Sequence, residues 1–286
     1  MYNLLDQLKV FPQFIIPQHT LTRIVYHITR CKFSLLKNFL IRIFIFYFKI
    51  DMEQACSKEI TSYKDFNHFF TRKIKSNLRP VTNTGIACPV DGTISQLGQI
   101  DGKNLIQAKG HFFNLANLVT SEDEAMKFDN GNFITLYLSP RDYHRIHMPI
   151  DGQLYKMLHV PGRLFSVNPA STRIIKNLFS RNERVVCLFD TIIGPMAIIM
   201  VGALFVGSVD TVWAGTVTSR KSNSISNWSY FEDGDVVNLK RGEELGRFNM
   251  GSSVIVLFGP GVMNWESGYK PGNPVLMGSR LGMINR

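Results

Sequence analysis

The chain beyond about residue 80 consists of short apolar runs that glycines, prolines and other turn-forming residues separate. The stretch 184–213 is an apolar meander that glycines punctuate, and 254–258 is a short apolar, β-branched run of the kind typical of a buried strand. A chain of 286 residues of which 45% are hydrophobic can also bury a sizeable core. The sequence therefore predicts an α+β protein whose main body is antiparallel β-structure of a sandwich-like or barrel-like type.

The first 50 residues have a different character. They contain one acidic residue, Asp6, against seven lysines and arginines, so this segment carries +6 of the formal net charge of +10. A basic segment attracts an anionic partner, either a nucleic acid or a membrane surface. The stretch 33–50 is too rich in Phe, Leu and Ile to follow a phosphate backbone, which favours a membrane and argues against nucleic acid.

The stretch 33–50 does not have the pattern of a membrane span. Basic residues interrupt it, and its longest uncharged piece, 43–48, is far shorter than the roughly 20 residues that a bilayer requires. On a helical wheel, Asn38, Arg42 and Lys49 form a narrow polar stripe opposite a broad apolar face. This pattern predicts a helix that lies in the lipid headgroup region with its basic residues toward anionic lipid. The alternative is a helix packed on the core of the protein itself.

These patterns divide the chain in two. We expect a helical membrane-associating segment at 1–60, broken at its prolines, and a β-rich domain at 61–286. The start of the chain does not resemble a signal peptide, because prolines interrupt its first apolar stretch and no small-residue cleavage site follows. The cysteines lack zinc-site spacing and are expected to be reduced, mostly buried thiols. The four cysteines are Cys31, Cys56, Cys88 and Cys187. We predict a peripheral protein on the cytoplasmic face of the cell membrane.

Two histidines, His144 and His147, lie in the sequence SPRDYHRIHMP, directly after the apolar run ITLYL. A loop at the end of a strand presents polar side chains, and this one also carries two arginines, an aspartate and a tyrosine. The H-x-x-H spacing could ligate a metal, but no nearby cysteine or glutamate completes a ligand set. Because histidine titrates near neutral pH, we favour acid–base catalysis over a structural role or a metal site.

The segment NMGSS at 249–253 places a glycine and two hydroxyls where a buried strand should begin. An ordinary turn is one explanation, since Gly, Ser and Asn are common in turns. The other is catalysis, in which Asp91 of the PVDG sequence orients His147 and His147 takes the proton of Ser252. For Asp91 alone, a place in a tight turn is the simpler alternative.

An aspartate, a histidine and a serine are typical of a hydrolase, but the G-x-S-x-G nucleophile elbow is missing. Ser252 enters a buried strand and has little room for an acyl substrate. The carbonyl of Gly251 is a nearer target, because glycine has no Cβ to obstruct the approach. Attack there would convert the peptide into an ester. Elimination would then break the chain and leave dehydroalanine, which hydrolyses to an N-terminal pyruvoyl group.

Many separate motifs, in order along nearly the whole chain, resemble the bacterial, self-cleaving phosphatidylserine decarboxylase family. SYKDFNHFFTRKI is similar to the S-Y-x-x-F-N-x-F-F-x-R segment of that family, and PVDGTISQLGQI resembles its aspartate motif. LYLSPRDYHRIHMPIDG resembles the two-histidine motif. GRFNMGSSVIVLFGPG stands where the family has L-G-S-T.

The resemblance implies a role for each residue already singled out. The chain would be cleaved between Gly251 and Ser252, and Ser252 would become the pyruvoyl group. Asp91 and His147 would complete the self-processing triad with Ser252. His144 is the candidate proton donor in decarboxylation, with His147 as the alternative.

The resemblance also implies a two-chain product. The larger β chain would comprise 1–251 and the smaller α chain 252–286, as a heterodimer or as a dimer of heterodimers. Ser166, in the sequence LFSVN, is expected at the substrate site. The departures from the family are Met250 for leucine and Ser253 for threonine, and both keep the chemical character of the position.

The reaction that the resemblance implies converts phosphatidylserine to phosphatidylethanolamine. Loss of CO2 leaves a carbanion beside nitrogen and requires an electron sink, which a pyruvoyl carbonyl supplies through a Schiff base with the substrate amine. Neither a metal nor pyridoxal phosphate is expected. Two other hypotheses remain open: a membrane-associated Ser-His-Asp lipid hydrolase, which needs an unbroken chain, and a non-catalytic membrane-binding β module.

Overall fold

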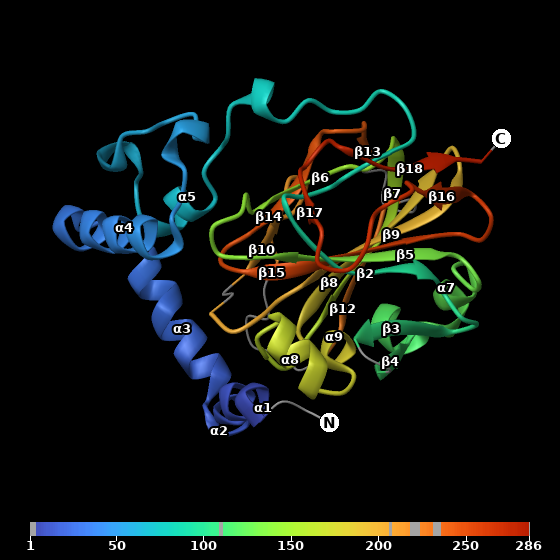
Figure 1. Ribbon diagram of the computed structural model, residues 1–286, viewed down its shortest axis with the longest axis horizontal. Coiled ribbons are helices and arrows are strands. Elements are labelled where there is room, and N and C mark those ends of the chain that lie inside the picture. The colour runs from blue at the N-terminus through green and yellow to red at the C-terminus, as the bar shows by residue number, and fades with distance from the viewer. Residues whose placement is uncertain (1–3, 109–110, 206–207, 218–223, 231–235, 286) are drawn as a thin grey trace.

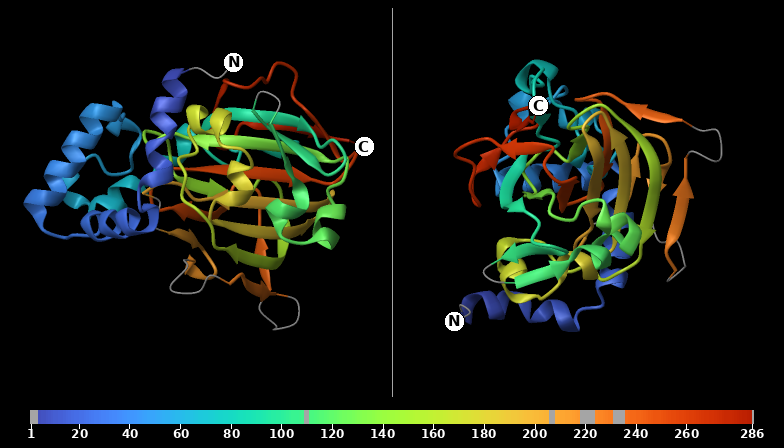
Figure 2. Two further views of the ribbon diagram at one scale, coloured as in Figure 1. Left: turned by 90° about the horizontal axis from the view of Figure 1, so that it is seen from below. Right: turned by 90° about the vertical axis from the view of Figure 1, so that its right-hand side faces the viewer.

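The computed structural model describes residues 4–285 except 109–110, 206–207, 218–223 and 231–235 (Figure 1). Four N-terminal helices form an arm at one side of a β body, as the two further views in Figure 2 also show. Prolines separate the first three helices, since Pro12 begins α2 and Pro17 immediately precedes α3. The helices are α1 (Leu4–Val10), α2 (Pro12–Ile15), α3 (Gln18–Thr29) and α4 (Ser34–Phe48).

Both ends of the arm are attached to other parts of the chain. Near the N-terminus, Asp6 of α1 accepts hydrogen bonds of 2.8 and 3.0 Å from the guanidinium of Arg173. At the other end, α4 packs against α5 (Phe66–Phe70), where the ring of Phe44 lies 5.0 Å from that of Phe66. Short 3-10 helices precede and follow α5: η1 (Met52–Gln54), η2 (Ile60–Ser62) and η3 (Ser76–Leu78).

A nine-stranded sheet forms the main body, and each pair of neighbouring strands in it is antiparallel. This confirms the prediction of an α+β protein with a mainly antiparallel body. In spatial order the strands are β12 (Ser226–Ser229), β7 (Gly152–Val160), β8 (Arg184–Thr191), β9 (Gly194–Val201), β15 (Ser252–Phe258), β5 (Asn132–Leu138), β2 (Gly92–Gln99) and β17 (Pro274–Val275), with β13 (Val237–Leu239) also paired to β7.

Smaller sheets and short helices surround this sheet. One four-stranded sheet has the order β11 (Gly215–Val217), β10 (Val209–Thr211), β14 (Glu244–Phe248) and β6 (Arg145–His147). A three-stranded sheet contains β1 (Ile86–Ala87), β18 (Arg280–Ile284) and β16 (Met263–Trp265), and β3 (Asn104–Ala108) pairs with β4 (His111–Asn114). The remaining helices are α6 (Leu115–Val119), α7 (Glu122–Met126), α8 (Pro169–Ile174) and α9 (Leu178–Arg181).

Strand β15 lies in the middle of the nine-stranded sheet, and all seven of its residues are buried. A strand covered on both faces needs apolar side chains at successive positions, which explains the run VIVLF. Two of the four cysteines, Cys88 and Cys187, are buried, whereas Cys31 is half-buried and Cys56 is exposed. The expectation of mostly buried thiols is therefore wrong for Cys56, which lies in the irregular segment between η1 and η2.

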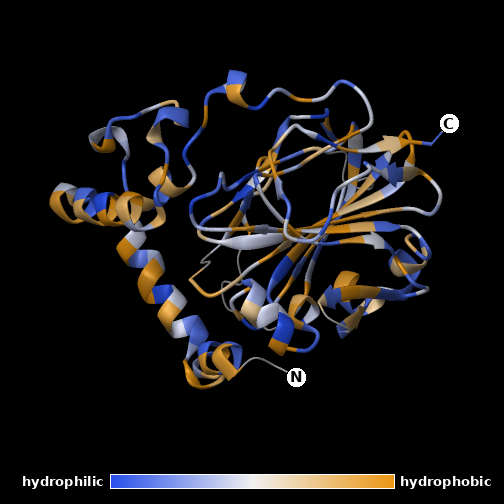
Figure 3. Ribbon diagram, viewed as in Figure 1, coloured by the Kyte–Doolittle hydropathy of each residue, from blue (hydrophilic) through white to orange (hydrophobic). Residues whose placement is uncertain are grey.

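Helix α4 presents one side to the protein and leaves an apolar side exposed. Ile41 is buried on the inner side, while Phe46 is 87% exposed on the outer side. The charged atom of Lys37 also points inward, because Nζ donates to the carbonyl of Tyr63 over 2.7 Å. Apolar residues recur along all four helices of the arm (Figure 3). Among the described residues, no helix is both long enough and apolar enough to cross a membrane.

Candidate active site

Three of the predicted site segments meet where three neighbouring inner strands of the nine-stranded sheet begin or end. Strand β5 ends at Leu138, and Leu138 pairs with Ser252, the first residue of β15. On its other side, β5 pairs with β2, which begins one residue after Asp91. Because adjacent strands lie about 4.8 Å apart, this register brings the start of β2, the end of β5 and the start of β15 within roughly 10 Å. The loop that carries the two histidines continues from the end of β5.

Asp91 is buried and paired with an arginine. Nε of Arg79 donates to Oδ1 of Asp91 over 2.8 Å, and Nη2 donates to Oδ2 over 2.5 Å. The backbone N–H of Met277 donates to the same carboxylate over 2.8 Å. The side chains of Arg79 and Asp91 are 9% and 8% exposed, so the pair is shielded from solvent. The hydrogen bonds to Asp91 in turn raise the pKa of Arg79.

His147 has a partner at each ring nitrogen. Nδ1 lies 2.8 Å from the carbonyl oxygen of Gly242, and Nε2 lies 3.1 Å from the hydroxyl oxygen of Tyr143. Because a carbonyl only accepts, we assign the proton to Nδ1, so that Tyr143 donates to Nε2. Burial lowers the pKa of His147, and the imidazole is neutral at pH 7. Its backbone N–H donates to Pro89, two residues before Asp91.

His144 is fully buried and has one unoccupied ring nitrogen. Its ring stacks on Phe70 with centroids 4.1 Å apart, and Nε2 lies 3.0 Å from the carbonyl oxygen of Ser139. That contact assigns the proton to Nε2 and leaves a lone pair on Nδ1, which has no hydrogen-bond partner among the described residues. Burial, reinforced by the nearby charge of Arg72, lowers the pKa of His144 to about 3. The side chain is therefore a neutral acceptor at physiological pH.

Ser252 is fully buried, and its hydroxyl has no hydrogen-bond partner within the described part of the chain. The same holds for Ser253. A buried hydroxyl without a partner costs free energy, so such a group often has a role beyond packing. A Cβ placed on Gly251 would meet no atom within 4 Å, so the peptide before Ser252 is open to approach.

The structure gathers these residues near the same ends of neighbouring strands but does not join the predicted triad by hydrogen bonds. In the described residues, the carboxylate of Asp91 binds Arg79 and Met277, and the ring of His147 binds Tyr143 and Gly242. Asp91 nevertheless lies close enough to His147 for its charge to favour the protonated imidazole. No group of three or more His, Cys, Asp or Glu side chains in the described ranges is arranged to hold a metal ion.

Ser166 lies beside the helical arm. Its backbone N–H donates to Oε1 of Gln13 in α2 over 2.8 Å. The residues that follow Ser166 line a cavity of about 270 Å³ that Tyr137 and Thr93 also border. Tyr137 pairs with Ser253, the residue after Ser252.

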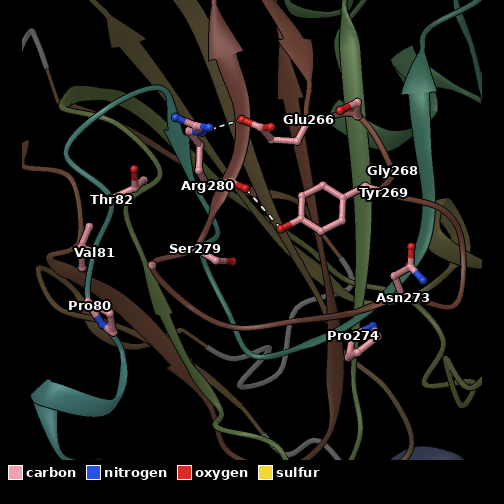
Figure 4. Close-up of a pocket in the computed structure, with 12 residues that line it drawn as sticks. Pro80, Val81, Thr82, Glu266, Gly268, Tyr269, Asn273, Pro274, Ser279 and Arg280 are labelled. Carbon is pink, nitrogen blue, oxygen red and sulfur yellow. Dashed lines mark hydrogen bonds and ion pairs between the residues drawn. The ribbon is translucent and has the colours of Figure 1, made fainter.

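A larger hollow of about 830 Å³ lies among the C-terminal strands (Figure 4). An ion pair between Glu266 and Arg280 spans part of it, and the hydroxyl of Tyr269 donates to the carbonyl of Arg280 over 3.2 Å. None of the predicted site residues lines this hollow. Its charged side chains, Glu266 and Arg280, already bind each other, which makes it a weaker candidate for the site.

Sequence reasoning missed the partners of the predicted residues. Arg79, which binds Asp91, precedes it by twelve positions and has no distinguishing pattern around it. Tyr143 was visible in the histidine loop, and its spacing of four from His147 was the available signal. Arg72 belongs to the segment 62–75; it is 5% exposed, and its Nε and Nη1 have no acceptor among the described residues.

Comparison with known proteins gives consistent matches. A family model described as phosphatidylserine decarboxylase matches residues 66–283, and a second, described as PSD, matches residues 8–49. A phosphatidylserine decarboxylase proenzyme of Methylococcus capsulatus is 50% identical over 273 residues, which cover 94% of each chain. Proenzymes of the same description from Acidovorax ebreus and Vibrio parahaemolyticus are 45% and 46% identical, covering 96% of this chain and 97% and 98% of theirs.

Proposed function

This chain belongs to the phosphatidylserine decarboxylase family, and on that basis we propose that it decarboxylates phosphatidylserine to phosphatidylethanolamine with a pyruvoyl group made from its own Ser252. The observation that carries the proposal is the position of Ser252. Its hydroxyl is buried and has no hydrogen-bond partner among the described residues, it follows an unobstructed glycine, and two neutral histidines lie near the same strand end.

The proposed maturation is a reaction of the chain with itself. His147 takes the proton of Ser252, and Oγ attacks the carbonyl carbon of Gly251. The C–N bond breaks as the C–O bond forms, and the proton passes to the released amine. The charge of Asp91 supports the protonated form of His147 at this step. Ser252 then loses its Cα proton, and the Gly251 carboxylate leaves its Cβ, which breaks the chain and forms dehydroalanine. Hydrolysis of dehydroalanine releases ammonia and gives the pyruvoyl group.

The residues at the start of β15 fit a pyruvoyl group. Ser252 has no other hydrogen-bonding task in the described structure, and the strand behind it holds the new N-terminus in place through pairs with β5 and β9. The carbonyl of a pyruvoyl group would supply the electron sink for the pair that CO2 leaves behind. Rigid support by a central strand keeps the reacting end in one orientation.

We assign His144 as the proton donor in decarboxylation. Burial keeps the imidazole neutral, so Nδ1 must take up a proton before it can return one to carbon. The stacked Phe70 ring and the Nε2 contact with Ser139 hold this nitrogen in place. His147 remains the alternative, since its Nε2 accepts from the Tyr143 hydroxyl and could receive a proton from it. The residues that follow Ser166 line the cavity of about 270 Å³, which supports a substrate-binding role for that segment.

The two chains that cleavage would create have many contacts with each other. The smaller chain, 252–286, would contribute the central strand β15, and β5 and β9 of the larger chain would flank it. Strands β17 and β18 of the smaller chain pair with β2 and β1 of the larger. These pairs support a stable heterodimer of 1–251 and 252–286.

We also propose that the helical arm seats the enzyme on an anionic membrane surface at the cytoplasmic face. The arm carries exposed apolar side chains on all four helices together with exposed basic residues such as Lys9, Arg23 and Arg42. Apolar contact with the acyl boundary and attraction to anionic headgroups act together in such segments. A substrate that is itself an anionic lipid lies at the same surface.

The test is the mass of the purified protein under denaturing conditions. We expect two chains, the smaller starting at residue 252 and lighter by one ammonia than a peptide that begins with serine. Ser252→Ala should give one chain, while Ser253→Ala, which changes the neighbouring buried hydroxyl, should still cleave. His147→Gln should block cleavage, whereas His144→Gln should cleave but release no CO2 from phosphatidylserine.

The competing hypotheses give different results in the same experiment. A single wild-type chain that cleaves lipid esters would identify a Ser-His-Asp hydrolase. A single chain with no lipid-modifying activity, unaffected by Ser252→Ala, would indicate a membrane-binding module. Either result would refute the proposed decarboxylase.

A further inference from the structure

Asn249, two positions before Gly251, is held by four hydrogen bonds. Asn249 is 1% exposed, and its Nδ2 donates to Oγ of Ser208 over 2.6 Å and to Oδ1 of Asp210 over 2.8 Å. Its Oδ1 accepts from Nδ2 of Asn67 over 2.9 Å, and its backbone N–H donates to the carbonyl of Ser208 over 3.0 Å. We call these contacts the Asn249 clamp.

The chain is fixed again only three residues later. Ser252 pairs with Leu138 of β5, and Ser253 pairs with strands on both sides. Only Met250 and Gly251 therefore connect the Asn249 clamp to a central strand of the sheet. Such a short connection between two fixed points can force its residues into unfavourable backbone conformations.

Met250 has such a conformation. Its φ is +110°, in a region that residues with a Cβ rarely adopt. Glycine would adopt it without strain, yet the glycine stands at the next position. Gly251 does not have a positive φ, and a Cβ there would meet no atom within 4 Å. An ordinary turn would place its glycine at 250, so backbone conformation does not explain the sequence Met250-Gly251.

We propose that the Asn249 clamp holds Met250 in a strained conformation in the uncleaved chain, and that this strain accelerates attack of Ser252 on Gly251. The proposal rests on the self-cleavage described above and adds two positioning residues to it. Met250 stores the strain, and Asn249 prevents the strain from relaxing before the reaction. Neither side chain takes part in bond making.

The chemistry of the first step explains how the strain is released. In the peptide, two bonds join the carbonyl carbon of Gly251 to Cα of Ser252, through the backbone nitrogen. In the ester, three bonds join the same atoms, through Oγ and Cβ. The C–N bond is replaced by a C–O bond, the hydroxyl proton moves to the nitrogen, and no electrons are gained or lost. The added bond lengthens the connection, so Met250 can return to a negative φ.

The first test measures the rate of chain cleavage. Newly synthesised precursor is sampled over time, and the fragment starting at residue 252 is quantified on denaturing gels and by mass. Met250→Gly removes the strain and should slow cleavage by roughly fivefold or more. Met250→Leu keeps a Cβ and similar apolar bulk, and should cleave at the wild-type rate. Asn249→Ala opens the clamp and should also slow cleavage.

The second test measures the strain without cleavage. In a Ser252→Ala background, Met250→Gly should raise the midpoint of thermal unfolding relative to Met250, because glycine accepts the positive φ. Met250→Leu in the same background should not raise it. A glycine that merely made the chain more flexible would lower the midpoint, so this measurement separates strain from flexibility.

The outcomes distinguish this proposal from the function on which it rests. If the wild-type chain does not cleave before Ser252, the proposed function itself is wrong. If the wild type cleaves and Met250→Gly cleaves equally fast, or if Met250→Gly lowers the unfolding midpoint, stored strain is refuted while self-cleavage stands. Normal cleavage by Asn249→Ala would refute the role of the clamp.

Discussion

Acidification should destabilise the uncleaved protein through His144. Burial lowers the pKa of this side chain to about 3 in the folded chain, against about 6.5 for histidine in an unfolded chain. Between these two values the unfolded state binds a proton that the folded state does not. The free energy of unfolding is therefore highest above pH 6.5 and falls as the pH drops toward 3.

The size of the effect follows from the two pKa values. At pH 7 both states of the chain are mostly unprotonated at this position, so little free energy is involved. At pH 5 the unfolded histidine is almost fully protonated, while the folded one, which is 0% exposed, stays neutral. Proton linkage converts this difference into a loss of about 2 kcal/mol in the free energy of unfolding between pH 7 and pH 5.

Urea unfolding at both pH values measures this loss. The proteins compared are Ser252→Ala, which should remain one chain, and the same protein with His144→Gln. Glutamine does not titrate and keeps an N–H that can donate to the carbonyl of Ser139. Other histidines, such as the half-buried His147, contribute equally to both proteins and cancel in the comparison.

We expect the protein with His144 to lose about 2 kcal/mol more than the glutamine variant on going from pH 7 to pH 5. Equal losses in the two proteins would mean that His144 protonates in the folded state without penalty. In that case it would be hydrated or paired with an acceptor, and its description as a buried neutral acceptor would be wrong.

Other changes test the contacts around the site and the arm. Arg79→Met leaves the buried carboxylate of Asp91 without its ion pair and should lower the free energy of unfolding by about 3–5 kcal/mol in urea titrations; a loss below about 1 kcal/mol would indicate a solvated pair. Tyr143→Phe removes the hydroxyl that donates to His147 and should slow chain cleavage by roughly fivefold, since a hydrogen bond contributes about 1 kcal/mol; an unchanged time course would exclude this role. Phe46→Ser removes a ring that is 87% exposed and should weaken sedimentation with anionic lipid vesicles by roughly tenfold or more, at an unchanged urea midpoint; equal binding would contradict membrane contact through α4.

The helical arm illustrates what the sequence could predict and where it stopped. The spacing of apolar residues in 33–50 correctly indicated a helix with an exposed apolar side, and Phe46 lies on it. The prediction did not anticipate that Lys37 turns inward to bind the carbonyl of Tyr63. Helical periodicity depends on near neighbours, whereas the partner of Lys37 comes from a segment 26 residues further along the chain.

The segment SYKDFNHFFTRKI, residues 62–74, shows a similar limit. Its clustered phenylalanines are buried, but the helix covers only Phe66–Phe70. Asp65 accepts from the backbone N–H of His68 and so begins the helix late. Beyond Thr71 the chain is bound by the histidine loop, where Nε of Arg145 donates to the Thr71 carbonyl over 3.0 Å.

The sequence by itself determined the antiparallel β body, the helical arm and the residue types at the candidate site, because alternation, turn residues and motif spacing are local properties. Only the tertiary structure decided that Asp91 binds Arg79, that His144 is buried as a neutral acceptor and that Met250 has a positive φ. Each of these depends on contacts between distant segments: Asp91 meets Met277 across 186 positions, and Asn249 meets Asn67 across 182. The charge state of a buried group and the strain of a connection depend on what surrounds them in space, and that is set only when the sheets have packed together.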